Sequence, residues 1–90
     1  MGVRYALAVN SGTSALMAGL AAFGLGPGDE VIVPAYTWIA TANAVVLHGA
    51  TPVIAEVDDS LTLDPADVQR RITDRTKGII AVHMQGVPTA

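Results

Sequence analysis

The stretch EVIVPAYTWIATANAVVL, residues 30–47, carries the pattern that decides the fold. It begins with a short, mostly apolar run at 30–33 that Pro34 closes, which predicts a β-strand. Residues 39–47 follow as a predicted helix that Gly49 ends. Because the strand is continuously apolar rather than alternating, it is typical of a parallel sheet that helices cover on both faces.

The same alternation of strand and helix runs along the whole chain. Strands are predicted at 5–9, 30–33, 52–57 and 78–82, and helices at 15–23, 39–47 and from Asp64 onward. Asp64 is the predicted N-cap of that third helix, with Pro65 at its first position. Val68 and Ile72 supply its buried stripe, while three charged residues face solvent: Arg70, Arg71 and Asp74. The β-α-β-α-β-α-β order predicts an α/β fold with a mostly parallel sheet and crossover helices.

Charge is scarce and unevenly distributed. The chain has 90 residues, of which 51% are apolar and 14% charged, and its net charge is −3. Residues 1–55 contain only Arg4, Asp29 and Glu30, whereas ten charged groups lie in 56–78. A free-standing domain of this size needs more polar cover than the first part offers. We therefore expect a fragment of something larger, or half of a tight assembly.

Composition also excludes several classes of function. The few basic residues give no footprint for nucleic acid, and the absence of cysteine removes disulfides and zinc–thiolate sites. No His, Asp or Glu grouping has metal-ligand spacing. The uncharged runs at 5–28 and 31–55 are interrupted by polar residues, Gly and Pro, so we expect no membrane partner. We expect a cytoplasmic protein.

Ligands of parallel α/β sheets bind beyond the carboxyl ends of the strands. Here those ends are predicted at 10–14, 34–38, 58–59 and 83–86. The first, NSGTS, permits two interpretations. A helix start can hold an anion, with Gly12 allowing close approach and Thr13 and Ser14 adding hydroxyl donors. Alternatively, Ser11 is the ordinary N-cap of a structural helix. The residues alone leave both open.

The aromatic and basic residues near these ends are weighed in the same way. Trp38, the only tryptophan, either stacks on a flat ligand or belongs to the core. For His83 we favour a core histidine with satisfied hydrogen bonds over a site residue. We interpret His48 as structural and Lys77, the only lysine, as solvated at the opposite sheet edge. Three glycines indicate a turn: Gly24, Gly26 and Gly28.

Taken together, the segments 6–16, 26–34, 36–44, 49–53 and 76–83, with Gly86, resemble the DegT/StrS-type sugar aminotransferases. These are pyridoxal 5'-phosphate enzymes of the aspartate aminotransferase fold, fold type I. The resemblance implies that residues 1–90 are a partial cofactor-binding large domain, from its N-terminal part. It also implies cofactor-binding residues: Gly12, Thr13 and Ser14 at the phosphate, and Trp38 against the pyridine ring.

The resemblance further implies an activity and its limits. The family transfers an amino group from glutamate or glutamine to a nucleotide-linked keto-sugar or a cyclitol ketone, and the intact enzyme is expected to be a homodimer. The family's cofactor-binding aspartate and lysine come later in the chain than this segment. We therefore expect no catalytic residue within 1–90 and no activity of these residues alone. Alternatives are another fold type I enzyme, such as a lyase or decarboxylase, a non-catalytic homologue with a structural role, and an unrelated phosphate-binding α/β domain.

Overall fold

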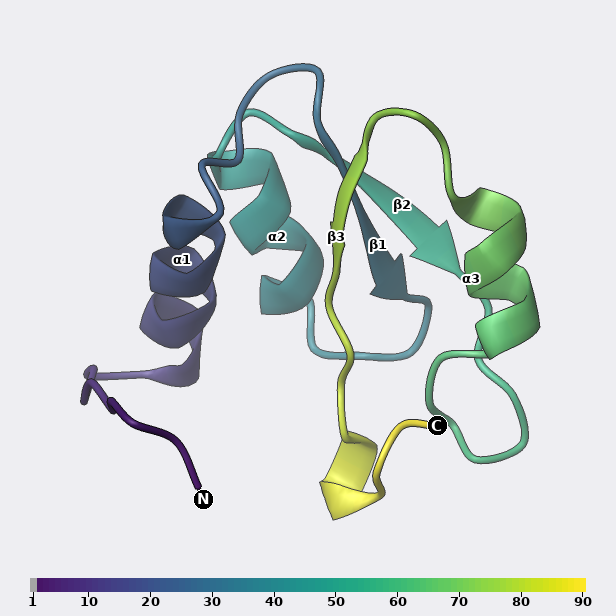
Figure 1. Cartoon of the computed structure of the whole chain (residues 1–90). Coiled ribbons are helices and arrows are strands. Elements are labelled where there is room, and N and C mark those ends of the chain that lie inside the picture. The colour runs from purple at the N-terminus through teal and green to yellow at the C-terminus, as the bar shows by residue number, and fades with distance from the viewer. Residues whose placement is uncertain (1) are drawn as a thin grey trace.

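Helices and strands alternate along the chain in the computed structural model, which describes residues 2–90 (Figure 1). The strands form one parallel sheet in the order β2-β1-β3, so the first strand lies at its centre. The elements are α1 (Gly12–Ala22), β1 (Glu30–Pro34), α2 (Ala40–Leu47), β2 (Thr51–Ala55), α3 (Pro65–Arg71), β3 (Thr76–Ile79) and a 3₁₀ turn, η1 (Met84–Gly86). This arrangement confirms the predicted α/β class and the parallel sheet.

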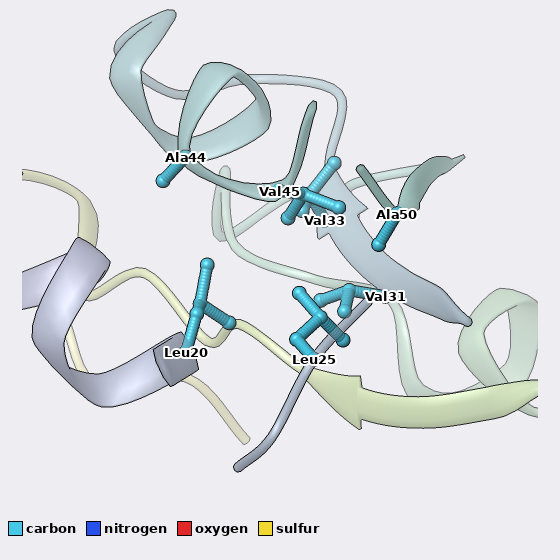
Figure 2. Packing of buried hydrophobic residues seen from close by; sticks show 7 residues of the cluster. All are labelled: Leu20, Leu25, Val31, Val33, Ala44, Val45 and Ala50. Atoms are coloured by element: carbon cyan, nitrogen blue, oxygen red, sulfur yellow. The ribbon is translucent and has the colours of Figure 1, made fainter. Parts of the chain in front are cut away.

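The core lies on both faces of β1. Val31 and Val33 point to the side covered by α1 and α2, where they pack with Leu20, Leu25, Ala44, Val45 and Ala50 (Figure 2). Ile32 points to the other side and packs with Ala55 and Leu63, next to Val68 of α3. The prediction of a strand buried on both faces is thus confirmed for β1. The outer strands differ, since Ile54 of β2 and Ile79 of β3 stay about half exposed.

The three predicted helices are confirmed, although α1 begins at Gly12 rather than at residue 15; α1 and α3 carry end signals of their own, whereas no side chain caps the start of α2. The Ser11 hydroxyl accepts the Ser14 N–H at 3.0 Å and begins α1. Gly24 follows the helix with φ +69°, a conformation that favours glycine. Asp64 accepts the Ala66 N–H at 3.0 Å through Oδ1 and begins α3, with Pro65 in its first turn.

The predicted strand at 5–9 is wrong. These residues form no strand, and Tyr5 and Leu7 are each 85% exposed. Within residues 2–90 no backbone hydrogen bond reaches this segment. A strand exists only when a neighbour pairs with it, and here the three paired strands leave it none. The sheet therefore has three strands rather than the four predicted.

The two outer strands also differ from their predicted limits. β3 lies at 76–79 instead of 78–82, because its ladder with β1 ends early. Ile80 still donates its N–H to the Ile32 carbonyl at 2.9 Å, but the next bond of a parallel ladder needs an N–H from Pro34, which has none. β2 ends at Ala55, whose carbonyl accepts the Ala35 N–H at 2.8 Å, while the Glu56 N–H on the outer edge donates to Asp67 Oδ2 at 2.7 Å.

The buried face of α3 matches the prediction at Val68, which packs against the core, but not at Ile72. Ile72 lies beyond the last helical residue and is 53% exposed, whereas Asp67 is only 4% exposed. Besides the Glu56 N–H, Asp67 accepts hydrogen bonds from Arg70 and Arg71 at 2.9 and 3.1 Å. The Glu56 hydrogen bond, followed by those of the arginines, lowers the pKa of Asp67 from its ordinary value. Arg70 and Arg71 therefore face solvent, as predicted, while closing over a buried carboxylate.

The amino ends of the strands lie at the edge opposite the candidate site. Lys77 is there, as predicted, and is 41% exposed, with Nζ 3.7 Å from Asp29 Oδ2 and 3.4 Å from the Gly24 carbonyl. Glu30 accepts hydrogen bonds from Thr73 and Arg75 at the same edge. Among the described helices, none combines the length and apolar character that crossing a bilayer requires.

Candidate cofactor-binding site

An open cavity of about 650 Å³ lies at the carboxyl edge of the sheet. Figure 1 shows that α1 begins at this edge, where β1 and β3 end and η1 follows. Its walls come from three segments that are distant in sequence: the start of α1, the β1–α2 loop and the chain after β3. The residues used below are Gly12, Thr13, Thr37, Trp38, His83 and Gln85. Three of the four predicted strand-end patches therefore meet in one place.

The fourth patch, at 58–59, lies outside this cavity. Asp58 instead accepts hydrogen bonds through Oδ1 from both the N–H and the hydroxyl of Ser60. These hydrogen bonds lower the pKa of Asp58 from its ordinary value. The loop is thus satisfied locally, and its acidic side chain takes no part in the wall of the cavity.

The start of α1 combines a helix cap with open donors. Ser11 uses its side chain for the Ser14 N–H and its carbonyl for the Ala15 N–H, each at 3.0 Å. The N–H groups of Gly12 and Thr13 donate to no acceptor within residues 2–90. Both residues line the cavity. The two interpretations of NSGTS are therefore compatible, because the cap occupies one N–H and leaves others for an anion.

Ser14 is placed differently from its two neighbours. Its hydroxyl donates to Asn10 Oδ1 at 2.6 Å and accepts from the Ser11 hydroxyl at 3.0 Å. Ser14 is not among the residues that line the cavity. To bind an anion, its hydroxyl would have to turn away from Asn10.

Trp38 lines the cavity and is 77% exposed, so the core alternative is wrong. Its backbone is nonetheless held: the Trp38 carbonyl accepts the Thr41 N–H at 3.0 Å. The hydroxyls of Thr37 and Thr41 lie 2.9 Å apart, and Thr41 is buried in α2. A large aromatic face is therefore presented to open space from an anchored loop, where a flat ligand could stack on it.

His83 is exposed and lines the same cavity, so the favoured prediction of a core histidine is wrong. Its Nδ1 accepts the Thr89 N–H at 3.0 Å, and the Thr89 hydroxyl donates to the Val82 carbonyl at 3.0 Å. The chain reverses between them at Gln85, with φ +54°, and Gly86, with φ +84°. Gln85 lies in the predicted patch 83–86, but Thr89 escaped the sequence analysis because no motif marks a hydrogen-bond partner six residues away.

His48 lies elsewhere and has a local partner. It forms the C-cap of α2, and its Nδ1 is 2.8 Å from the Ala44 carbonyl. Among residues 2–90, no three His, Asp or Glu side chains gather as a metal site would require. The part of the cavity wall that residues 2–90 form also contains no carboxylate and no lysine. Its chemistry is that of a binding surface: open N–H groups for an anion, an aromatic face and one imidazole.

This donor set fits a phosphorylated aromatic cofactor such as pyridoxal 5'-phosphate. The two N–H groups at the positive end of α1 suit a phosphate, and Trp38 suits a flat ring on the same cavity. Among residues 2–90, none in the wall provides an amine for a covalent bond to an aldehyde. The fit therefore covers the phosphate and the ring face.

Comparison with known proteins gives one family. Residues 1–90 match the model of the DegT/DnrJ/EryC1/StrS aminotransferase family. GDP-perosamine synthase from Caulobacter vibrioides is 52% identical over 86 residues, which are 94% of this chain and 23% of the synthase. The crystal structure of 3-amino-5-hydroxybenzoic acid synthase superposes with a TM-score of 0.95 and 46% identity over 98% of this chain and 23% of that protein.

A third relative is known with its cofactor. Spr1654 from Streptococcus pneumoniae, named as a sugar aminotransferase and solved in a PLP form, gives a TM-score of 0.86 and 41% identity over 89% of this chain and 21% of its own. The same protein is also known in a PMP form. The chain thus spans less than a quarter of the length of each of these relatives.

Proposed function

We propose that this chain, which belongs to the DegT/DnrJ/EryC1/StrS aminotransferase family, forms the phosphate- and ring-binding wall of a pyridoxal 5'-phosphate site in a sugar aminotransferase. One observation carries the proposal: the open N–H groups of Gly12 and Thr13 and the exposed face of Trp38 line the same cavity. Aminotransferase relatives in PLP and PMP forms support it.

Each residue has a distinct part in this proposal. Gly12 and Thr13 bind the phosphate through backbone N–H groups, and the absence of a side chain at Gly12 permits close approach. Ser14 adds a hydroxyl once it turns from Asn10. Trp38 fixes the plane of the ring and excludes water from one face. When bound, the cofactor supplies an electron sink for chemistry at the amino-bearing carbon.

The covalent part of the reaction is assigned to residues outside 1–90. Lys77 lies at the amino edge of the sheet, across from the cavity, and contacts Asp29 and Gly24. We therefore propose that residues 1–90 are part of a large cofactor-binding domain, and that the cofactor's lysine and aspartate lie elsewhere in the whole protein. Residues 1–90 alone would then transfer no amino group.

The whole protein is proposed to move an amino group from glutamate or glutamine to a keto-sugar linked to a nucleotide, or to a cyclitol ketone. The similarity to GDP-perosamine synthase supports a nucleotide-linked acceptor. A homodimer is proposed on the strength of the exposed apolar side chains, which include Tyr5, Leu7 and Phe23. Side chains of this size and number indicate that more protein covers them.

The test uses 4'-deoxypyridoxine 5'-phosphate, which carries the ring and phosphate but no aldehyde, so it cannot react with Lys77. Because Trp38 is the only tryptophan, its fluorescence reports on the cavity. We expect saturable quenching that inorganic phosphate reverses at higher concentration, with N-acetyltryptophanamide as the control for light absorption. Quenching no greater than that of the free tryptophan analogue would refute cofactor binding. Amine transfer above a no-protein control would refute the predicted inactivity of residues 1–90.

A further inference from the structure

The segment after β3 is held in place by its own hydrogen bonds. Gly86 donates its N–H to the His83 carbonyl at 2.9 Å, and Val87 donates to the Met84 carbonyl at 3.0 Å. Thr89 then returns to the start of the segment, with its N–H on His83 Nδ1 and its hydroxyl on the Val82 carbonyl. The His83 imidazole is therefore held by Thr89, six residues later in the chain.

This contact determines which ring nitrogen carries the proton. A nitrogen that accepts the Thr89 N–H must offer a lone pair, so Nδ1 is unprotonated and the proton of the neutral ring is on Nε2. Within residues 2–90 no acceptor pairs with Nε2–H. Since Thr89 occupies Nδ1 and His83 lines the cavity, Nε2–H is the polar ring atom left to meet a ligand.

We propose that His83 is a binding residue of this site, whose neutral ring Thr89 orients so that Nε2–H donates a hydrogen bond to an oxygen of the flat ligand lying against Trp38. The inference rests on the proposed function. It adds a donor from the segment after β3 to those at the start of α1. It also gives Thr89 the part of a positioning residue, which acts only through His83.

Two substitutions of His83 separate binding from anchoring. His83→Asn places an amide oxygen where Nδ1 stands, so it can still accept the Thr89 N–H but lacks the distal donor. His83→Gln reaches farther and can place an amide N–H near the position of Nε2, while losing the acceptor for Thr89. A role in ligand binding and a role in holding the loop therefore predict opposite rankings of the two variants.

The binding assay measures 4'-deoxypyridoxine 5'-phosphate with the whole chain by Trp38 fluorescence. We expect His83→Asn to weaken binding roughly three- to tenfold, the contribution of one neutral hydrogen bond, and His83→Gln to stay within about twofold of wild type. Equal affinities in His83→Asn and wild type, equal losses in both variants, or a greater loss in His83→Gln would each overturn the inference. Amide ¹H–¹⁵N spectra establish that each variant keeps the wild-type fold.

Nuclear magnetic resonance tests the orientation independently of any ligand. Long-range ¹H–¹⁵N spectra at about pH 8, where an ordinary imidazole is neutral, are expected to show the Nε2–H form for His83. The His83→Asn spectrum identifies the signal, because the chain has only two histidines. Thr89→Pro removes the N–H and is expected to give mixed tautomers, whereas Thr89→Ala keeps it and the single form.

The outcomes distinguish this inference from the proposed function. A wild-type chain that fails to bind the probe overturns both. Binding by wild type with no loss in His83→Asn overturns the inference alone. A mixture of tautomers in the wild-type chain overturns the positioning role of Thr89.

Discussion

Gly12→Ala is the sharpest test of the proposed phosphate contact, because it changes the cavity without disturbing the fold. Gly12 is the first residue of α1, and its φ lies outside the left-handed region. A Cβ built on it meets no atom within 4 Å. The added methyl therefore enters open space beside the N–H groups of Gly12 and Thr13, where the phosphate is proposed to lie.

The two expected effects have opposite signs. Alanine is favoured over glycine within a helix by about 0.5–1 kcal/mol, so the free energy of unfolding should stay equal or rise by up to that amount. A hydrogen bond to a charged group contributes about 1.5–3 kcal/mol. Losing one such contact should weaken binding of 4'-deoxypyridoxine 5'-phosphate by more than about tenfold.

Gly19→Ala is the matched control. Gly19 belongs to the same helix, its added Cβ also meets nothing within 4 Å, and it is absent from the cavity wall. It should raise the free energy of unfolding by about 1 kcal/mol and leave binding unchanged. Urea unfolding followed by circular dichroism and titration of Trp38 fluorescence measure the two quantities. Wild-type affinity in Gly12→Ala, with an intact fold, would show that no phosphate approaches this backbone.

Three further substitutions test the ring contact, the core and the buried carboxylate. Trp38→Ala should weaken binding of the same probe, measured by calorimetry, by roughly two- to tenfold, whereas Trp38→Tyr retains an aromatic face and most of the affinity; equal affinities in the two variants would contradict stacking. Ile32→Ala, at a side chain that is 0% exposed, should lower the free energy of unfolding by about 2–5 kcal/mol in urea. Ile54→Ala, on an exposed edge strand, should cost much less, and similar costs at both positions would contradict the assigned core. The folded-state pKa of Asp67 lies below its ordinary value of 3.8, so its contribution to stability is present above that pH and is lost as the pH falls through the folded-state pKa. Asp67→Asn should therefore be less stable than wild type at neutral pH and approach it in acid, as followed by urea midpoints across pH; a difference independent of pH would contradict the assignment.

The sequence predicted the helices well because their limits depend on nearby residues. Ser11, Gly24 and the Asp64–Pro65 pair each act within one turn of the helix end that they set. The strand at 5–9 failed for the opposite reason. An apolar run becomes a strand only if another strand lies beside it, and no local signal reports whether one does.

The candidate site was predicted in its place but not in its details. Parallel topology brought the start of α1, the loop with Trp38 and the segment with His83 to one edge, as the strand-end rule requires. The exposure of the Trp38 and His83 side chains could not be inferred from the sequence, because it depends on which residues pack against them. The bond from Thr89 to His83 depends on a left-handed glutamine, a conformation that residue type alone does not announce.

Pro34 links the extent of the sheet to the existence of the cavity. On the side of β1 that faces β3, the next N–H of the ladder would be that of Pro34, donated to the Ile80 carbonyl. Proline has no N–H, so this bond cannot form. The segments that follow β1 and β3 therefore separate at the point where residues 80–85 begin to line the cavity. Residues 80–85 could not both continue the ladder with β1 and leave the cavity open. Because Pro34 has no N–H, the pairing ends there and residues 80–85 line the cavity instead.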